Sequence, residues 1–204
     1  MTSIADIMNT APVIPVIVVD DVEHAVPLAR ALVAGGLRVL EVTLRTPAAL
    51  DAIRAMKGVD GAIVGAGTVT NQRELADAID AGSEFIVSPG LTEPLGKAAI
   101  RENIPFLPGI ANAGDIMRGL DIGLTHFKFF PAMAAGGLPA LKALAAPFGQ
   151  CRFCPTGGVS LDNAREWLAL DPVLCVGGSW VAPRGSVDEA EVERVAREAA
   201  ALTS

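Results

Sequence analysis

Two kinds of segment alternate along the chain, and this alternation limits the possible folds more than any other feature. Short runs rich in β-branched and aromatic residues are typical of buried strands, and Ala-rich stretches of helical character lie between them. Strict alternation of this kind predicts a parallel sheet with helices outside it. The eight predicted strands are Val13–Val19, Val39–Leu44, Ala62–Val69, Phe85–Ser88, Pro105–Ile110, His126–Phe130, Arg152–Pro155 and Val173–Val176.

The stretches between these runs carry helix signals. Thr46 is predicted as an N-cap before Pro47 at the first helical position, and Asn71 as an N-cap three residues before Glu74. A further helix is predicted within residues 1–12. The other predicted helices are His24–Ala34, Pro47–Met56, Arg73–Ala81, Glu93–Glu102, Gly114–Leu120, Leu138–Ala145, Asp162–Leu170 and Asp188–Leu202.

The number of units favours a closed barrel. Eight units in 204 residues are about 25 residues each, near the lower limit for a (β/α)8 barrel. The length also favours one domain, because single cores split only above about 250–300 residues. We therefore expect an α/β chain with one (β/α)8 TIM-barrel domain over residues 1–204, parallel strands inside and helices outside. The alternative is an open, doubly wound sheet.

Composition excludes several classes of protein. With 51% hydrophobic and 19% charged residues, the chain is not expected to be disordered. A net charge of −7 argues against nucleic-acid binding, which needs a basic surface. No apolar run reaches the roughly 18–20 residues that span a membrane, and the N-terminus does not resemble a secretory signal. Three cysteines, an odd and low number, predict reduced thiols in the cytoplasm.

Two predicted strands carry a charge, and barrel strands are otherwise buried. Glu41 lies between Leu40 and Val42, and Lys128 lies between two phenylalanines. Side chains alternate along a strand, so Glu41 and Arg45 are predicted on the inner face, with the apolar face toward the helices. By the same rule Lys128 points inward. Arg45 falls at the carboxyl end of its strand, where barrel enzymes carry their chemistry.

The charged pair has two interpretations. One is a structural ion pair between Lys128 and Glu41, although such pairs are costly and often replaceable by apolar residues. The other is a catalytic pair. Desolvation disfavours the charged ammonium, which leaves a lysine able to attack a carbonyl, and a nearby glutamate can move protons.

Glycines and hydroxyls at the last strand ends suggest an anion site. Gly157 and Gly158 follow the seventh predicted strand, and Gly177-Gly178-Ser179 follow the eighth. Paired glycines let backbone N–H groups approach an anion, and these loops frequently bind phosphate in barrels. Ordinary turn formation is the alternative. Thr68, at the end of the third strand, is equally compatible with helix capping and with substrate contact.

Other motifs fail. Gly65-x-Gly67 lacks the third glycine of a dinucleotide fingerprint. Cys151 and Cys154 match C-x-x-C, but their odd separation on a strand predicts that they face opposite sides, as core residues. No cluster of His, Cys and carboxylates indicates a metal site, so no metal and no other cofactor is expected.

The strand segments resemble a known family, the class I aldolases of 2-keto-3-deoxy-6-phosphogluconate and 4-hydroxy-2-oxoglutarate found in the bacterial Entner–Doudoroff pathway. The similar segments occur in family order over nearly the whole chain. They are Pro15–Val18, Val39–Thr46, Gly65–Val69, Ser88–Leu91, Phe127–Ala132, Arg152–Gly158 and Gly177–Trp180.

The resemblance implies a role for each matching site residue. Lys128 would form the Schiff base and Glu41 would be the general acid/base. The remaining residues would bind the substrate. Arg45 and Thr68 would hold the carboxylate of its pyruvyl part, which Thr156 would also contact, and Phe130 would shape the aldehyde side. The phosphate would be held by Gly157, Gly158 and Ser179. The substrate would be cleaved to pyruvate and D-glyceraldehyde 3-phosphate, in a cytoplasmic homotrimer.

One residue departs from the family pattern and leaves the substrate open. Met133 stands where relatives often carry Glu, in a loop that borders the site. The same mechanism could therefore act mainly on 4-hydroxy-2-oxoglutarate or on the galactonate epimer. A metal-dependent pyruvate aldolase and a non-catalytic phosphosugar-binding barrel are the further alternatives.

Overall fold

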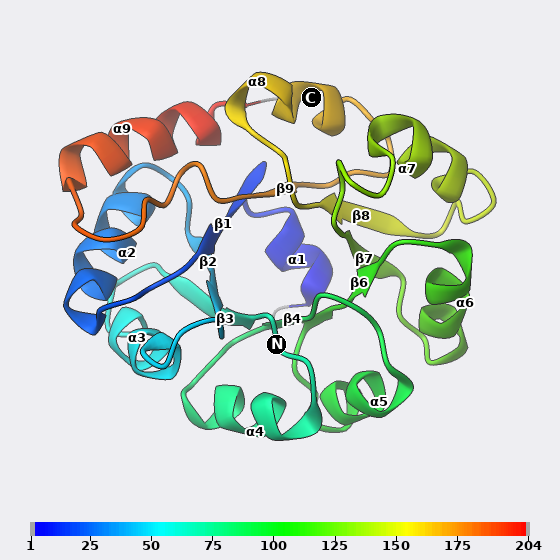
Figure 1. The fold of residues 1–204 in the computed structure, drawn as a ribbon, viewed down its shortest axis with the longest axis horizontal. Coiled ribbons are helices and arrows are strands. Elements are labelled where there is room, and N and C mark those ends of the chain that lie inside the picture. The colour runs from blue at the N-terminus through cyan, green and yellow to red at the C-terminus, as the bar shows by residue number, and fades with distance from the viewer. Residues whose placement is uncertain (1–2, 203–204) are drawn as a thin grey trace.

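Parallel strands lie at the centre of residues 3–202, the part of the chain that the computed structural model describes, and helices surround them (Figure 1). The strands are β1 (Val13–Ile17), β2 (Val39–Thr43), β3 (Ile63–Gly67), β4 (Ile86–Val87), β5 (Phe106–Leu107), β6 (Gly109–Ile110), β7 (His126–Phe129), β8 (Arg152–Pro155) and β9 (Val176–Gly178). The helices are α1 (Ile4–Met8), the 3-10 helix η1 (Val22–His24), α2 (Ala25–Ala34), α3 (Ala49–Met56), α4 (Gln72–Asp80), α5 (Glu93–Arg101), α6 (Ala113–Asp121), α7 (Gly137–Ala145), α8 (Leu161–Leu168) and α9 (Glu189–Ala200).

The strands form a curled parallel sheet in two parts. Six strands follow the order β5-β4-β3-β2-β1-β9, and three follow the order β6-β7-β8. β5 and β6 belong to one predicted strand that Pro108 divides, because proline has no N–H for the ladder. The Pro108 carbonyl still accepts the Lys128 N–H at 2.8 Å. Two isolated parallel bridges, Phe153 to Val173 and Thr156 to Gly177, connect β8 with the segment that contains β9.

The last strand begins later than predicted. The sequence predicted Val173–Val176, followed by a glycine loop, whereas β9 contains both Gly177 and Gly178. These glycines pair with Ile14 and Pro15 of β1. This pairing makes them strand residues, and they are glycines because a Cβ would meet the Thr156 side chain at Gly177 and the Trp180 ring at Gly178. The predicted glycine turn is present at Gly157 and Gly158.

The predicted start of the third helix is also wrong. The N-cap of α3 is Ala48, not Thr46, and Pro47 precedes the helix. The Thr46 hydroxyl instead donates to the Val19 carbonyl, which ties the end of β2 to the end of β1. By contrast, Asn71 caps α4 as predicted, since its side chain accepts the Glu74 N–H at 3.0 Å.

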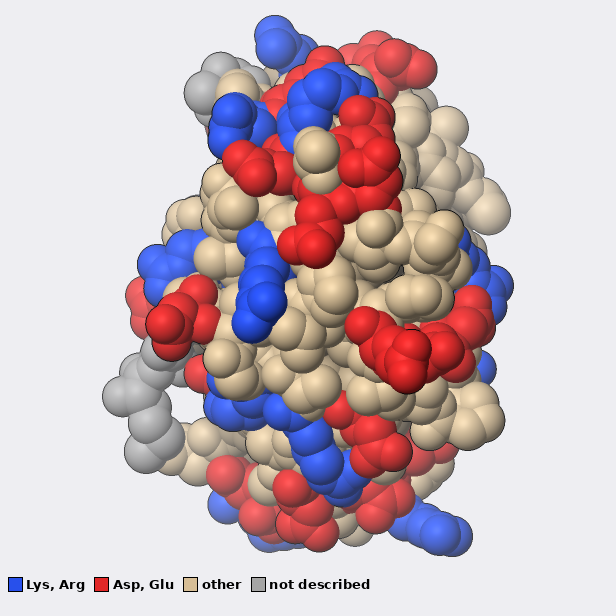
Figure 2. All heavy atoms as spheres, turned by 90° about the vertical axis from the view of Figure 1, so that its left-hand side faces the viewer, with Lys and Arg blue, Asp and Glu red and all other residues tan. Residues whose placement is uncertain are grey.

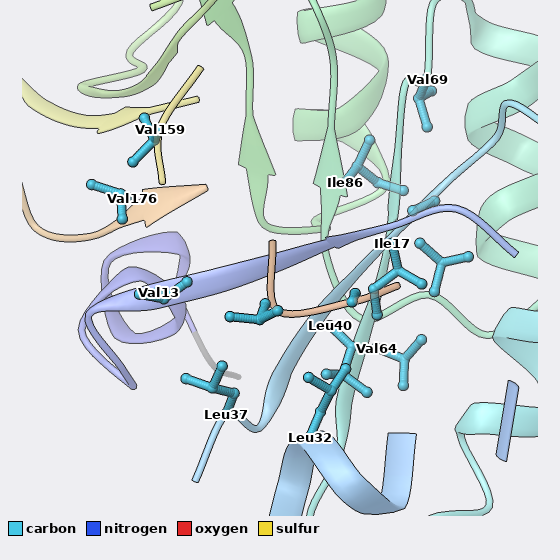
Figure 3. Close-up of a cluster of buried hydrophobic side chains, with 14 of the residues drawn as sticks. Val13, Ile17, Leu32, Leu37, Leu40, Val64, Val69, Ile86, Val159 and Val176 are labelled. Carbon is cyan, nitrogen blue, oxygen red and sulfur yellow. The ribbon is translucent and has the colours of Figure 1, made fainter. Parts of the chain in front are cut away.

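Two apolar layers hold the strands in place. An outer layer lies between strands and helices, where Ile17, Leu40 and Val64 pack toward Leu32 of α2 (Figure 3). A smaller inner cluster fills the space within the curled sheet. It contains Ile7, Met8, Ile14, Val39, Phe85, Val87, Leu107, Cys154 and Cys175. The period of two along each strand separates the layers, as predicted for β2.

Helix α1 belongs to the inner cluster rather than to the outer ring. It lies inside the ring of strands in Figure 1, and its Ile7 and Met8 are fully buried. It is shorter than the predicted 1–12, and residues 1–2 lie outside the described residues. A capping box between Ser3 and Asp6 begins the helix. The apolar end of this short helix therefore covers the amino-terminal side of the inner cluster.

Charged side chains of both signs mix on the outer helices. Figure 2 views the side of the molecule formed by α2, α3 and α9, where acidic and basic residues alternate without a continuous basic stripe. On α9, Arg194 pairs with Glu191 at 2.7 Å, and Arg197 pairs with Glu193. Within residues 3–202 no helix is both long and apolar enough to cross a membrane.

The half-buried His126, at the start of β7, makes stability depend on pH. Burial, with the nearby charge of Arg152, lowers the pKa of His126 below the usual 6.5. Below about pH 6.5 the unfolded chain therefore binds more protons at this position than the folded chain does. The free energy of unfolding should fall as the pH drops from about 7.5 to 5.5. This dependence should be weaker in His126→Gln, as urea denaturation at each pH will show, and an equal slope in both proteins would contradict it.

Candidate active site

A buried amine and a buried carboxylate meet across the interior of the curled sheet. Lys128 Nζ lies 2.9 Å from Glu41 Oε1, and the two residues are only 5% and 2% exposed. Lys128 comes from β7 and Glu41 from β2, which belong to different parts of the sheet. Both inward directions predicted from strand periodicity are confirmed. The pair is charge-compensated and almost excluded from solvent, so its electrostatic interactions are stronger than at the surface.

Aromatic and sulfur-containing side chains surround this pair. The Phe130 ring centroid lies 5.5 Å from Lys128 Nζ. Two thiols, Cys154 and Cys175, are buried in the inner cluster. A hydrogen bond with Cys154, together with burial and the charge of Glu41, raises the pKa of the Cys175 thiol well above its usual value. The Cys175 thiol beside the pair is therefore kept in its neutral form.

Thr156 and the cysteines show how the end of β8 is arranged. Thr156 is buried, and its hydroxyl lies 3.8 Å from Cys154 Sγ. Cys151 belongs to the outer layer and Cys154 to the inner cluster, which confirms that the C-x-x-C residues face opposite sides. Sequence analysis assigned nothing to Cys175. The apolar run around it predicted a buried strand, but only strand packing brings its thiol near Glu41.

Arg45 and Thr68 lie at the carboxyl ends of neighbouring strands. β2 and β3 pair in register, with Thr43 opposite Gly67. Arg45 lies two residues after Thr43, and Thr68 lies directly after Gly67. Arg45 is exposed, and Thr68 is partly buried. Thr68 has φ of 61°, a left-handed conformation that is an outlier for a β-branched residue. Strained residues of this kind cluster at functional sites, which favours substrate contact over simple helix capping at Thr68.

Two substitutions at Thr68 separate strain from function. Thr68→Ala keeps a Cβ at positive φ, whereas Thr68→Gly removes it, so the glycine variant should be more stable by about 1 kcal/mol. Both variants lose the hydroxyl, and the KM for the substrate should rise about tenfold in both if that hydroxyl holds the substrate through one hydrogen bond. Urea denaturation and steady-state kinetics measure these effects. A Thr68→Ala variant more stable than Thr68→Gly would show that the positive φ at position 68 does not strain a residue with a Cβ.

The predicted anion-binding residues meet at the ends of β8 and β9. Gly157 and Gly158 form a turn with φ of 99° and 78°, which glycine adopts without strain. Thr156 bridges to Gly177, so this turn and the exposed Ser179 lie at the ends of neighbouring strands. The Met133 N–H donates to the Gly157 carbonyl at 3.1 Å. The Met133 side chain, half exposed, lies against Gly158.

All predicted site residues therefore lie in the interior or at the carboxyl ends of parallel strands, on one side of the sheet. Among the described residues no group of three or more His, Cys, Asp or Glu side chains is arranged to hold a metal ion. A parallel α/β fold with a desolvated lysine beside a glutamate is the arrangement expected of an enzyme that acts on carbonyl compounds through an amine.

Comparison with known proteins agrees with this class. The family model "KDPG and KHG aldolase" matches residues 4–198. The KHG/KDPG aldolase of Escherichia coli K12 is 58% identical over 197 residues, which cover 96% of this chain and 92% of that protein. The chain therefore belongs to the KDPG and KHG aldolase family.

Solved structures show the same relationship. The 2-keto-3-deoxy-6-phosphogluconate aldolase of Zymomonas mobilis ZM4, crystallised with 3-phosphoglycerate, is 57% identical with a TM-score of 0.97, over 100% of this chain and 97% of that one. The KDPG aldolase of Legionella pneumophila, with pyruvate captured as a covalent carbinolamine, is 44% identical with a TM-score of 0.92, over 100% and 99%.

Proposed function

We propose that this protein is a class I (Schiff-base) aldolase that cleaves 2-keto-3-deoxy-6-phosphogluconate to pyruvate and D-glyceraldehyde 3-phosphate. The observation that carries the proposal is the 2.9 Å contact between buried Lys128 Nζ and Glu41 Oε1. A close relative that traps pyruvate as a carbinolamine supports the covalent chemistry. The protein is thus a carbon–carbon lyase.

The reaction begins at the ketone. Neutral Lys128 attacks C2, and Glu41 transfers protons, through a water molecule, so that the carbinolamine loses water and becomes an iminium ion. Glu41 then accepts the C4 hydroxyl proton, the C3–C4 bond breaks, and its electrons move into the iminium to form an enamine. The aldehyde leaves. Protonation of the enamine at C3 and addition of water release pyruvate and restore the amine.

The remaining residues hold the two ends of the substrate. Arg45 pairs with the carboxylate, where a guanidinium can form two parallel hydrogen bonds, and Thr68 and Thr156 contact the same pyruvyl part. Phe130 shapes the aldehyde side. The phosphate is bound by the N–H groups of the glycine turn and by a hydroxyl; these residues are Gly157, Gly158 and Ser179. Binding both ends orients the C3–C4 bond between Lys128 and Glu41.

We infer that one domain carries this site, a (β/α)8 barrel over residues 1–204. β5 and β6 count as one strand divided at Pro108, and the bridges from β8 to Val173 and Gly177 supply the contact that closes the ring. Counted in this way the strands number eight. This arrangement brings β2 and β7 to opposite sides of one interior, as the Lys128–Glu41 contact requires.

The proposal also names one preferred substrate among three related compounds. The alternative substrates are 4-hydroxy-2-oxoglutarate, whose aldolase activity the name of the Escherichia coli relative includes, and the galactonate epimer. The glycine turn favours a phosphorylated substrate, because its N–H groups suit an anion of this size. Comparison of kcat/KM for the three compounds tests this order, and a higher value for 4-hydroxy-2-oxoglutarate would overturn it.

The direct test of the mechanism is reduction of the covalent intermediate. The protein is incubated with pyruvate and borohydride, and its intact mass and peptide map are measured. One reduced pyruvyl unit on the Lys128 peptide is the expected result. A folded protein without an adduct would overturn the proposal. Inactivation by a chelator would then indicate a metal-dependent aldolase, and pyruvate binding without turnover a non-catalytic binding protein.

We also propose that the enzyme is a homotrimer in the cytoplasm. The family resemblance implies the trimer, and exposed apolar side chains such as Ile100 and Met117 suit contact between subunits. The three unpaired cysteines suit a reducing compartment. Light scattering at micromolar concentration should give three times the chain mass of 21.0 kDa.

A further inference from the structure

The inner face of β3 has almost no side chains. Its inward positions are Ile63, Gly65 and Gly67, whereas Val64 and Ala66 belong to the outer layer. Side chains from neighbouring segments fill the space above the two glycines. The Phe85 ring lies over Gly65, and the Glu41 side chain lies over Gly67. The two glycines therefore provide room for different groups.

The contact at Gly67 concerns the carboxylate of the active pair. A Cβ at position 67 would lie 2.6 Å from Glu41 Cγ and 2.8 Å from Cδ, and closer still to Oε1, the atom that contacts Lys128 Nζ. Real Cβ atoms do not approach heavy atoms this closely. Glu41 cannot move freely away, because it is only 2% exposed and its carboxylate holds the lysine.

The backbone at Gly67 does not itself require glycine. Gly67 lies in an extended strand, opposite Thr43, and its carbonyl accepts the Leu44 N–H at 2.8 Å. Alanine adopts this conformation without difficulty. The three heavy atoms nearest to the added methyl group would all belong to the Glu41 side chain.

We propose that Gly67 is a positioning residue, whose missing side chain allows the Glu41 carboxylate to lie against the Lys128 amine. The proposal rests on the proposed function, since it assigns Gly67 to the same proton-transfer step. A methyl group at position 67 displaces the carboxylate but leaves Lys128 in place. Proton transfer to and from the substrate should then suffer more than covalent capture of the ketone at equilibrium.

Gly65 offers a matched control. It lies on the same strand and the same face, and a Cβ there would come within 2.6 Å of the Phe85 ring. Gly65 pairs with Glu41 across the β2–β3 ladder, but the three atoms nearest to a Cβ at position 65 all belong to the Phe85 ring. Gly65→Ala therefore introduces a similar steric conflict whose closest contacts are with Phe85 rather than with the Glu41 carboxylate. A purely structural effect of crowding on β3 should appear in both variants.

The experiment compares the wild type, Gly67→Ala and Gly65→Ala by three measurements. The first is the extent of borohydride trapping with pyruvate after equilibration. The second is kcat for substrate cleavage. The third is exchange of the pyruvate methyl protons in D2O, followed by NMR, which reports proton transfer at C3 without an aldehyde.

Both kcat and the rate of methyl proton exchange are divided by the fraction of lysine that is trapped. The resulting values should be about 10- to 100-fold lower than wild type in Gly67→Ala and near wild type in Gly65→Ala. Values within about twofold of wild type in Gly67→Ala, or equal losses in both variants, would overturn the proposal. A wild type that gives no adduct would instead refute the proposed function.

A second comparison applies if Gly67→Ala folds poorly. In a Glu41→Ala background the added methyl group meets no carboxylate. Gly67→Ala should therefore lower the urea midpoint in the wild-type background and leave it unchanged beside Glu41→Ala. An equal decrease in both backgrounds would show that Glu41 is not the group that the methyl displaces.

Discussion

Lys128→Ala should abolish turnover, with kcat lower by at least about 10⁴-fold, because no other amine lies beside Glu41 in the described interior. The variant should also lose stability. Removing one partner of a buried ion pair leaves the other charge without compensation, at a cost of about 3–5 kcal/mol. A folded fraction measured by circular dichroism is therefore needed beside the kinetics.

Lys128→Arg separates the two effects. Its guanidinium keeps the positive charge beside Glu41 but does not become a neutral amine in proteins. We expect a folded protein with no borohydride adduct and no measurable cleavage. Turnover above about one per cent of wild type in a homogeneous preparation of Lys128→Arg would contradict the role of Lys128 as the nucleophile.

Glu41→Gln should have the second largest effect, a decrease in kcat of about 10²- to 10⁴-fold, the usual contribution of a general acid/base. Glutamine has the shape of glutamate and can still accept a hydrogen bond from Lys128, so the pocket is preserved. It cannot take the C4 hydroxyl proton. Pyruvate should still form an adduct with Lys128, at a lower rate, because the amine remains.

Trapping and cleavage must therefore be measured in the same preparation of Glu41→Gln. Retained adduct with slow cleavage supports proton transfer by Glu41. A kcat within about threefold of wild type would remove Glu41 from the mechanism. Complete loss of the adduct in a folded protein would contradict the expectation that the amine of Lys128 forms the imine without the Glu41 carboxylate.

The direction of each strand residue could be predicted because alternation along a strand is local. Leu40 and Val42 on one side, and Glu41 on the other, follow from the period of two, whatever the strand packs against. The same rule placed Lys128 on the strand face opposite to Phe127 and Phe129, and Cys151 on the face opposite to Cys154. A helix cap such as Asn71 was predictable for the same reason, since its partner is three residues away.

Boundaries that depend on distant partners were less predictable. Thr46 was a plausible cap, but a carbonyl at the end of β1 offered its hydroxyl another acceptor. Gly177 and Gly178 resembled a loop, but pairing with β1 makes them strand. Pro108 divides a predicted strand because the ladder needs an N–H that proline lacks.

The amino-acid pattern alone was sufficient to predict the α/β class, the inward faces of the strands and the family to which the chain belongs. Local periodicity and the order of motifs along the chain carry this information. Only the tertiary structure showed that Glu41 and Lys128, 87 positions apart, come within 2.9 Å. It also showed that the empty side of Gly67 receives the carboxylate. Both results depend on how distant strands curl around one interior and on which side chains fill it, and neither is encoded in any short segment.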